Sequence, residues 1–376
     1  MSNNLGLYIH IPFCQKQCHY CDFLTFVGRE DQMRPYIDHL RMEIKLHARR
    51  SERVDTIYFG GGTPSYLPTH LIREVMTALR ENFALSPDCE IAIEMNPESV
   101  TEEALLSYLD LGFNRFSMGV QSFDDRVLRL MGRLHNKESV LQKIDLMGKL
   151  GIDNYSIDLM FANPGQDFQV LEQDIKTLKN LPINHVSYYS LMYKENTAFY
   201  RWLKTGQIKP YNDEVEREMY HYIQSELRAC GLQQYEISNF ARPGYESHHN
   251  MKYWQLEDYL GLGIGASSNI GLVRTTNVPT FEKYYQMVEE GQFPCQVDEE
   301  LTLEDREKEY IILSMRLLKG FSIDKINQRF GIDFETKYQE AIHKHLQTGL
   351  VQIDQGHFQF TDKGLDIGNQ FYLDII

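Results

Sequence analysis

Three cysteines near the start of the chain have the spacing of a shared metal centre. Cys14, Cys18 and Cys21 are spaced C-x3-C-x2-C, so half of the six cysteines fall in one short stretch. The apolar run from Leu5 to Ile11 predicts a buried strand, and Pro12 ends it. A tight loop after a strand can direct three thiolates at one point, and thiolates are the ligands that soft metals prefer.

Two metal centres fit these cysteines. Zinc would need a fourth ligand, which His10 or His19 could supply. A [4Fe–4S] cluster usually takes four cysteines, so three would leave one iron open to a ligand that is not protein. The spacing favours the cluster and leaves zinc as the alternative. A disulfide is the least favoured interpretation, because three thiols lie close together in a chain with no evident export signal.

Composition narrows the class of protein. The chain has 376 residues, which predicts one large and one smaller domain. Its formal net charge is −15, from 38 basic and 53 acidic residues, which argues against general nucleic-acid binding. No apolar run is long enough to predict a transmembrane segment. The first residues lack the basic region of a signal peptide, so we expect a cytoplasmic protein.

The order of elements predicts an α/β fold. Six strands alternate with helices between residues 5 and 191, which favours a curved parallel sheet. Six units are fewer than the eight of a closed barrel, so we predict a partial (β/α)6 TIM-like barrel. Ser99 and Glu102 have the spacing of a capping box, which predicts that the helix after the third strand begins there. The expected strands are Leu5–Ile11, Val54–Phe59, Glu90–Met95, Arg115–Gln121, Asn154–Met160 and His185–Leu191.

Several polar or flexible residues fall where βα-barrel sites are built, at the ends of these strands. The segment 60–64, GGGTP, follows the second strand, and its glycines allow a ligand close to the backbone. A plain tight turn is the alternative. Glu94 lies near the end of the third strand, where a carboxylate is costly to bury unless paired; an exposed strand glutamate is the alternative. Asp158 lies on the fifth strand and, by residue type alone, could form a surface ion pair with Arg133.

The cysteine motif, with Tyr20 before its last cysteine, resembles that of the radical S-adenosylmethionine (SAM) superfamily. The longer string YIHIPFCQKQCHYCDF is similar to the branch that holds the oxygen-independent coproporphyrinogen III oxidases (HemN) and the haem chaperones (HemW). The resemblance implies a [4Fe–4S] cluster on the three cysteines, whose open iron chelates SAM, and it implies the partial barrel. Positions matching SAM contacts of the family are Tyr8, Gly61, Gly62, Thr63, Glu94, Gln121, Arg133 and Asp158.

A second motif lies in the looser region after the barrel, which also predicts a strand at Gln234–Ser238. The segment 249–254, HNMKYW, matches the HNxxYW motif of the same relatives. Histidine is a common axial ligand of haem iron, and aromatic walls suit a flat macrocycle. The resemblance therefore makes His249 a candidate haem contact. The alternative is a loop packed on the barrel by Trp254, with its histidines satisfied by hydrogen bonds.

The last segment changes character at about Leu301. Its pattern predicts three helices, then a hairpin around the 354–356 turn, and a final helix capped by Thr361. This order resembles a winged helix, but residues 301–376 hold 9 basic against 12 acidic residues, a net charge of −3, whereas a DNA-reading wing is basic. We expect a lid or a partner surface. The predicted domains are residues 1–290, a radical SAM core with a haem-handling extension, and 300–376, a HemN-type C-terminal domain.

Two functions remain after this reading. The first is a haem chaperone that binds a [4Fe–4S] cluster, exchangeable SAM and haem, and passes haem to an acceptor protein. The second is oxidative decarboxylation of coproporphyrinogen III, so the sequence leaves open whether the chain is an enzyme. Phe23 stands where the oxidases have a fourth cysteine, and only seven residues precede Tyr8 where the oxidases carry a long segment. Both differences favour the chaperone.

Overall fold

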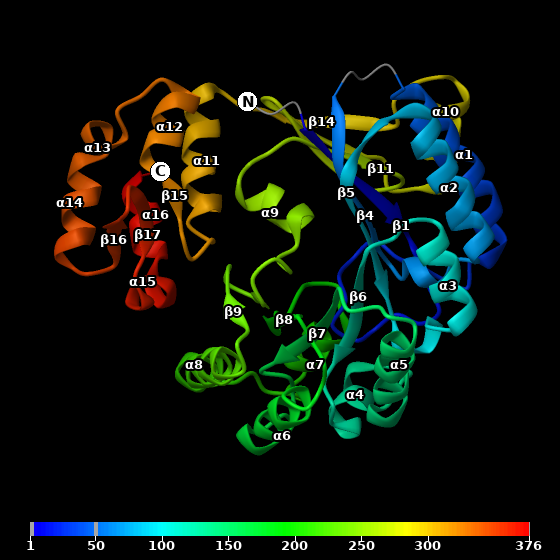
Figure 1. The fold of residues 1–376 in the computed structure, drawn as a ribbon, viewed down its shortest axis with the longest axis horizontal. Helices are drawn as coiled ribbons and strands as arrows, with labels where there is room; N and C mark the ends of the chain where they lie inside the picture. The colour runs from blue at the N-terminus through cyan, green and yellow to red at the C-terminus, as the bar shows by residue number, and fades with distance from the viewer. Residues whose placement is uncertain (1–3, 49–51, 376) are drawn as a thin grey trace.

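The computed structural model describes residues 4–48 and 52–375, and its central feature is a curved sheet of 12 strands (Figure 1). The six predicted strands are present and parallel, and they neighbour one another in chain order. The predicted partial barrel is therefore confirmed. Its strands are β1 (Asn4–Ile11), β4 (Arg53–Gly61), β5 (Ala84–Met95), β6 (Arg115–Gln121), β7 (Tyr155–Phe161) and β8 (His185–Ser190).

Helices cover the convex face of this sheet (Figure 1). Their apolar sides form one core with the strands, in which residues such as Leu40, Val75 and Ile144 are buried. The predicted capping box is wrong: Thr101 is the N-cap of α3 and accepts a hydrogen bond from the Ala104 amide. The helices are α1 (Met33–Leu46), α2 (Thr69–Asn82), α3 (Glu102–Asp110), α4 (Asp125–Met131), α5 (Lys137–Lys149) and α6 (Phe168–Leu178).

Further strands extend the sheet at both ends. Next to β1 lies β11 (Tyr259–Leu262), parallel to it, followed by the antiparallel β12 (Ser267–Ile270), β13 (Val273–Asn277) and β14 (Cys295–Glu300). At the other end β8 pairs with β10 (Asn239–Ala241) and β10 with β9 (Gln233–Gln234), both antiparallel. The strand predicted at Gln234–Ser238 is thus wrong: a turn separates two shorter strands there.

Side chains alternate across the pleated strands, and the concave side is polar. On β6, Phe116, Met118 and Val120 are buried under the helices, whereas Arg115 and Ser117 face the interior of the barrel. A closed TIM barrel fills this space with branched apolar side chains. Here the same positions carry polar groups, and they line a cavity.

A short helix, α9 (His248–Trp254), lies on the concave side between the sheet and the C-terminal elements (Figure 1). It contains the HNxxYW segment, so that segment is helical. Ser247 is its N-cap and accepts a hydrogen bond from the Asn250 amide. Between β8 and α9 the chain forms α7 (Ala198–Lys204) and α8 (Asp213–Ala229), and α10 (Phe281–Glu289) packs against α1.

The C-terminal elements have a core of their own, in which Ile311, Phe334, Phe358 and Phe371 are buried together. The predicted hairpin forms, and Thr361 caps the helix after it by accepting from the Gly364 amide, as expected. A helix-rich, winged-helix-like region is therefore present. Its elements are α11 (Leu303–Ser314), β15 (Phe321–Ser322), α12 (Ile323–Phe330), α13 (Phe334–Lys337), α14 (Gln339–Gln347), β16 (Val351–Asp354), β17 (His357–Phe360), α15 (Asp362–Ile367) and α16 (Asn369–Ile375).

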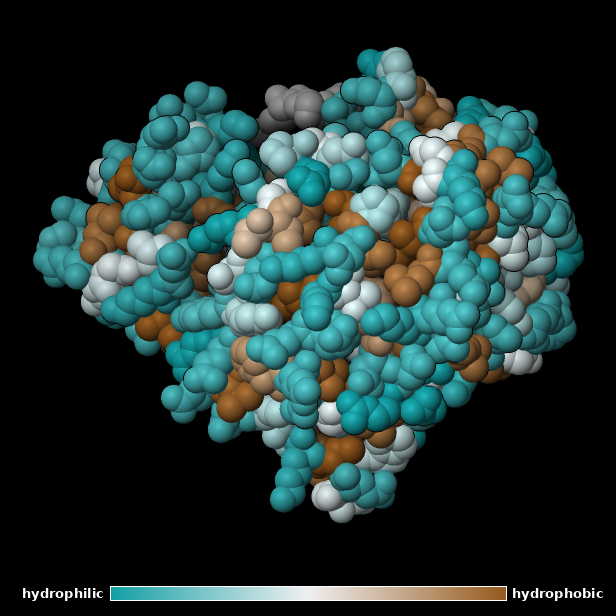
Figure 2. All heavy atoms as spheres, turned by 60° about the horizontal axis from the view of Figure 1, so that its bottom comes forward, coloured by the Kyte–Doolittle hydropathy of each residue, from teal (hydrophilic) through white to brown (hydrophobic). Residues whose placement is uncertain are grey.

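The surface agrees with the acidic composition. On the face seen in Figure 2, hydrophilic residues predominate and hydrophobic residues lie in small separate patches. Among the described residues, no helix combines the length and apolar character needed to cross a membrane. Residues 1–3, 49–51 and 376, which the predicted domains include, lie outside the described residues.

Candidate functional site

The three cysteines face one cavity of about 470 Å³ at the carboxyl ends of the parallel strands. Cys14 ends the short strand β2 (Phe13–Cys14), which pairs with β3 (Phe26–Val27), while Cys18 and Cys21 lie in the irregular loop between them. His19 anchors this loop, since its Nδ1 lies 2.8 Å from the Leu130 carbonyl oxygen. All six cysteines are free thiols.

The cysteine environment fits a metal centre. Burial raises the pKa of the Cys14 thiol, and it raises that of Cys21 to about 12. Buried thiols of this kind become thiolates when a cation is bound beside them. In a cubane cluster each cysteine ligates a different iron, so the thiols need to face one space rather than one point. Within residues 4–48 and 52–375 no three His, Cys, Asp or Glu side chains converge so as to hold a single metal ion.

The two histidines considered as zinc ligands are engaged elsewhere. His10 has its Nε2 3.0 Å from the Leu24 carbonyl oxygen and its Nδ1 3.0 Å from the Tyr8 hydroxyl. His19 packs its ring against Trp202, with centroids 4.8 Å apart. Both side chains position the loop rather than face the cavity, so this chain offers the three thiols as the ligand set.

The glycine turn after β4 forms the wall beside the cysteines. Gly61 has φ +114°, and a Cβ there would lie 2.6 Å from the His10 ring. A Cβ on Gly62 would lie 2.7 Å from the Phe13 carbonyl oxygen and 3.1 Å from the Cys14 sulfur. The turn therefore needs glycine for close approach. Thr63 connects the glycine turn to the cysteine loop, because its Oγ1 is 3.5 Å from the Cys14 sulfur.

Two partly buried carboxyl groups line the cavity. Glu94 accepts hydrogen bonds from the Tyr58 hydroxyl at 2.8 Å and from the Gly61 amide at 3.3 Å. Burial raises its pKa to about 7, with the nearby Asp158 adding to the rise. Asp158 accepts from Ser117 at 2.7 Å, and burial also raises its pKa. Such groups ionise readily beside a cationic ligand, and SAM carries a sulfonium and an ammonium group.

Arg133 and Gln121 also line the cavity. Arg133 donates to Asn96 Oδ1 at 2.6 Å and lies 3.4 Å from the Cys18 sulfur, and its buried Nε has no partner among the described residues. Burial opposes its charge, but the pKa is raised overall, with Tyr20 and Cys18 the largest contributors. Gln121 has φ +70° at a bulge between β6 and β7. Left-handed backbone at a non-glycine residue often marks a functional position.

Two predicted residues do not line the cavity. Tyr8 stacks behind Tyr58, with centroids 6.3 Å apart. His249 is fully buried, and its Nδ1 and Nε2 lie 2.8 Å from Thr56 Oγ1 and 2.9 Å from the Tyr253 hydroxyl. Burial lowers its pKa to about 3, with the Lys252 charge contributing. A haem iron could bind His249 only after one of these contacts is released. The other predicted residues surround the cavity together: Cys14, Cys18, Cys21, Gly61, Gly62, Thr63, Glu94, Gln121, Arg133 and Asp158.

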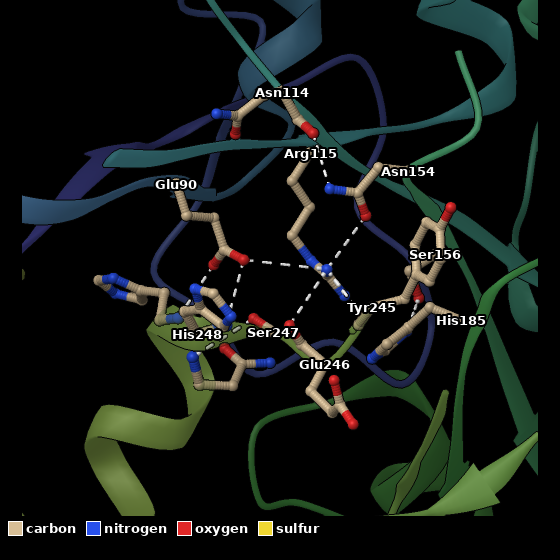
Figure 3. Close-up of polar contacts among 12 residues, drawn as sticks. Glu90, Asn114, Arg115, Asn154, Ser156, His185, Tyr245, Glu246, Ser247 and His248 are labelled. Atoms are coloured by element: carbon tan, nitrogen blue, oxygen red, sulfur yellow. Dashed lines mark hydrogen bonds and ion pairs between the residues drawn. The ribbon is translucent and has the colours of Figure 1, made fainter. Parts of the chain in front are cut away.

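The far end of the cavity is formed by the start of α9, and two charged residues that the sequence did not single out hold it there. Glu90 on β5 accepts from the backbone amides of His248 and His249 at 3.1 and 2.9 Å. Arg115 on β6 donates to the Tyr245 carbonyl oxygen at 3.0 Å (Figure 3). These contacts hold the segment 245–250 against the sheet. The alternation of polar residues along β6 is the sequence signal that could have pointed to Arg115.

The last residue of α9 and the two residues after it contact the C-terminal elements. Arg316 lies over the Trp254 ring at 4.3 Å, and Ser314 donates to the Trp254 carbonyl oxygen at 3.1 Å. Arg329 donates to the carbonyl oxygens of Gln255 and Leu256 at 3.0 and 2.6 Å. One helix therefore joins the cavity to the C-terminal core.

Comparison with known proteins agrees with this geometry. The radical SAM superfamily profile matches residues 8–178, and the HemN C-terminal domain profile matches residues 301–367. A solved structure of the Escherichia coli coproporphyrinogen III oxidase HemN, described as a radical SAM enzyme, superposes with a TM-score of 0.86 at 27% identity. It covers 100% of this chain and 90% of HemN. The fold and the cysteine-lined cavity define a radical SAM protein.

Two relatives assign the chain to one family among the radical SAM proteins. The haem chaperone HemW of Bacillus subtilis is 34% identical over 97% of both chains. The haem chaperone HemW of Lactococcus lactis is 32% identical over 97% of this chain and 95% of its own. The chain belongs to the HemW family.

Proposed function

We propose that this protein is a haem chaperone, which binds haem and a [4Fe–4S] cluster with exchangeable SAM and transfers haem to an acceptor protein. The observation that carries the proposal is the match to HemW over nearly the whole length of both chains. The cofactors of this family are the cluster, SAM and haem. The likeness to HemN reflects the shared fold, and the HemW relatives do not favour decarboxylation of coproporphyrinogen III as the alternative.

The residues that would hold the cluster and SAM follow from the cavity. Cys14, Cys18 and Cys21 would ligate the cluster, which supplies an open iron site for SAM when it is bound. Glu94 and Asp158 would balance the cationic charge of SAM, because both carboxyl groups line the same cavity and accept hydrogen bonds there. The remaining predicted SAM contacts are Tyr8, Gly61, Gly62, Thr63, Gln121 and Arg133. Of these, Tyr8 would act through Tyr58, against which it stacks.

His249 remains a predicted haem contact. Its ring nitrogens are 2.8 and 2.9 Å from protein hydroxyls, so the alternative is a positioning residue that fixes α9 on β4. We also propose the division into residues 1–290 and 300–376, supported by the separate apolar cores. The acidic C-terminal part would then serve as a lid or partner surface rather than a DNA-binding module.

The test begins with anaerobic reconstitution and a haem titration followed by absorbance. We expect about one haem per chain, and iron with sulfide that disappears when Cys14, Cys18 or Cys21 is replaced by alanine. The haem-loaded protein is then mixed with a haem-depleted cell extract that includes the membranes, or with protein-free liposomes. Faster transfer to the extract than to the liposomes supports a chaperone. Equal rates, or the absence of saturable haem binding, would refute it.

The alternatives have their own readouts in the same preparation. Protoporphyrinogen formed from coproporphyrinogen III, SAM and a reductant would support the oxidase instead. Stoichiometric zinc in place of iron would rule out the assignment of a [4Fe–4S] cluster. A His249→Ala variant that binds haem as tightly as the wild type would leave His249 as a positioning residue.

A further inference from the structure

The far end of the cavity contains a buried arginine with a free donor group. The Arg115 side chain is 5% exposed, and the residue lines the cavity. Its Nη1 donates to the carbonyl oxygens of Tyr245 and Glu246 and to Asn154 Oδ1, and lies 3.9 Å from Glu90. Its Nη2 is buried and has no hydrogen-bond partner among the described residues. Buried N–H groups are rarely left in this state.

We propose that this end of the cavity binds a carboxylate, and that the carboxylate is a propionate of haem. The proposal rests on the proposed function, which implies haem, a ligand with two propionate carboxylates. Arginine suits the role, since its planar guanidinium can meet a carboxylate with parallel N–H groups. Nη1 fastens the segment before α9, and Nη2 binds the ligand.

Neighbouring side chains supply further donors for the same group. Asn250, on the first turn of α9, lines the cavity, and no hydrogen bond to a described residue engages its side-chain amide. Ser247 also lines this end, and its hydroxyl accepts from the Asn250 backbone amide, which leaves its own proton free to donate. An arginine, an amide and a hydroxyl group thus face one space, and a carboxylate is the ligand group that can accept from all of them.

The surrounding charges allow an anion here. Glu90 lies on the side of the guanidinium away from Ser156 and His185 (Figure 3), where the α9 amides engage both of its oxygens. Asp158 is the other nearby carboxyl group, and Ser117 and Ser156 donate to its oxygens at 2.7 and 2.9 Å. His185 is held neutral, since burial lowers its pKa well below the usual range, with Arg115 contributing.

The HNxxYW segment gains a different role from this arrangement. His249 turns towards Thr56 and away from the cavity, whereas Asn250, the next residue, faces it. The motif therefore meets the propionate through its asparagine, while the present contacts of its histidine hold the helix that carries that asparagine. The sequence pattern alone could not separate these roles.

The decisive experiment compares haem with its dimethyl ester, in which both carboxylates are masked. Wild-type protein should bind haem roughly tenfold or more tightly than the ester, as expected for hydrogen bonds between charged groups. In Arg115→Lys the preference should largely disappear, because lysine can replace Nη1 at the Tyr245 carbonyl but leaves no second nitrogen. In Asn250→Asp haem binding should fall by a similar factor while ester binding does not.

Controls separate local from general effects. Asn180→Asp adds the same charge at an exposed position after α6, and Arg73→Lys makes the same exchange at an exposed ion pair on α2. Neither should change the preference for haem over the ester. If Arg115→Lys does not fold, Asn250→Asp carries the test alone, since no described residue forms a hydrogen bond with its side chain.

The outcomes distinguish the sources of the carboxylate. SAM also carries one, so SAM affinity is measured in each variant. A large loss of SAM affinity with an unchanged haem-to-ester ratio would overturn the proposal in favour of SAM. Equal binding of haem and ester by the wild type would overturn it as well, while leaving the chaperone function intact. If neither porphyrin binds, the proposed function itself fails.

Discussion

A buried carboxyl group behind the cysteine strand makes the stability of the fold depend on pH. Glu43 on α1 is fully buried and accepts hydrogen bonds from the Gly263 amide at 2.8 Å, the Tyr284 hydroxyl at 2.6 Å and Asn277 Nδ2 at 2.7 Å. Burial raises its pKa from 4.5 to about 7, against the opposing effect of these donors. Glu43 therefore releases its proton at a higher pH in the folded chain than in the unfolded chain.

The sign and size of the effect follow from this difference. Between pH 4.5 and about 7 the folded chain keeps a proton that the unfolded chain has released. The free energy of unfolding then falls by about 1.4 kcal/mol per pH unit as the pH rises. The stabilisation is complete below the unfolded pKa, and roughly 3 kcal/mol is lost once the pH has passed the folded pKa.

Replacing Glu43 by glutamine removes this titration with little change of shape. Near pH 5 we expect Glu43→Gln to be less stable than the wild type, because its amide N–H groups face Asn277 Nδ2. The difference should shrink by roughly 2.5 kcal/mol by about pH 7.5. Urea unfolding followed by tryptophan fluorescence measures it, with the exposed Glu282→Gln on α10 as the control. A difference that is the same at both pH values would refute the reasoning.

Three further predictions concern the cavity and α9. Gly62→Ala should lower the iron content after reconstitution, because its Cβ would lie 2.7 Å from the Phe13 carbonyl oxygen, while Gly148→Ala, with nothing within 4 Å, should not. Glu94 has a pKa raised to about 7 by burial, so it ionises as the pH rises through that value and the affinity for cationic SAM should rise with it. Calorimetry should show up to about tenfold weaker binding per pH unit below the pKa, and Glu94→Gln should lack this component; an identical pH profile would contradict the role. Arg316→Gln should destabilise the protein by about 1 kcal/mol and alter Trp254 emission, which a Trp202→Phe background isolates; unchanged emission would show that the ring contact at 4.3 Å contributes nothing.

The barrel could be predicted closely from the sequence because its signals are local. The residues of β6 match the expected bounds, since apolar alternation marks them. The capping residue of α3 was misplaced because Ser99, Thr101 and Glu102 all suit a helix start, and only tertiary packing decides between them. Ser99 instead bonds to Ser65 at 2.5 Å.

Local sequence signals place some of the cavity residues, whereas contacts between distant segments decide the others. Residues at the ends of parallel strands necessarily meet, so Glu94 and Asp158 could be placed together from the predicted strands. The orientation of His249 depends on Thr56, which is distant in sequence, and on the Glu90 carboxylate at the start of its helix. No local pattern encodes such pairings. The polar alternation along β6 was visible in the sequence, but only the sheet register shows that Arg115 reaches α9.

The double contact of α9 decides where this chain can be recombined with a relative. A chimera joined at the apparent border near residue 300 would unite a foreign C-terminal core with a helix shaped for Arg316 and Arg329. A junction before residue 245 would keep those contacts but separate the helix from Glu90 and Arg115. Residues 245–256 must therefore be compatible with both the barrel and the C-terminal core of a chimera. Exchanging whole domains between relatives should fail more often than exchanging single strands.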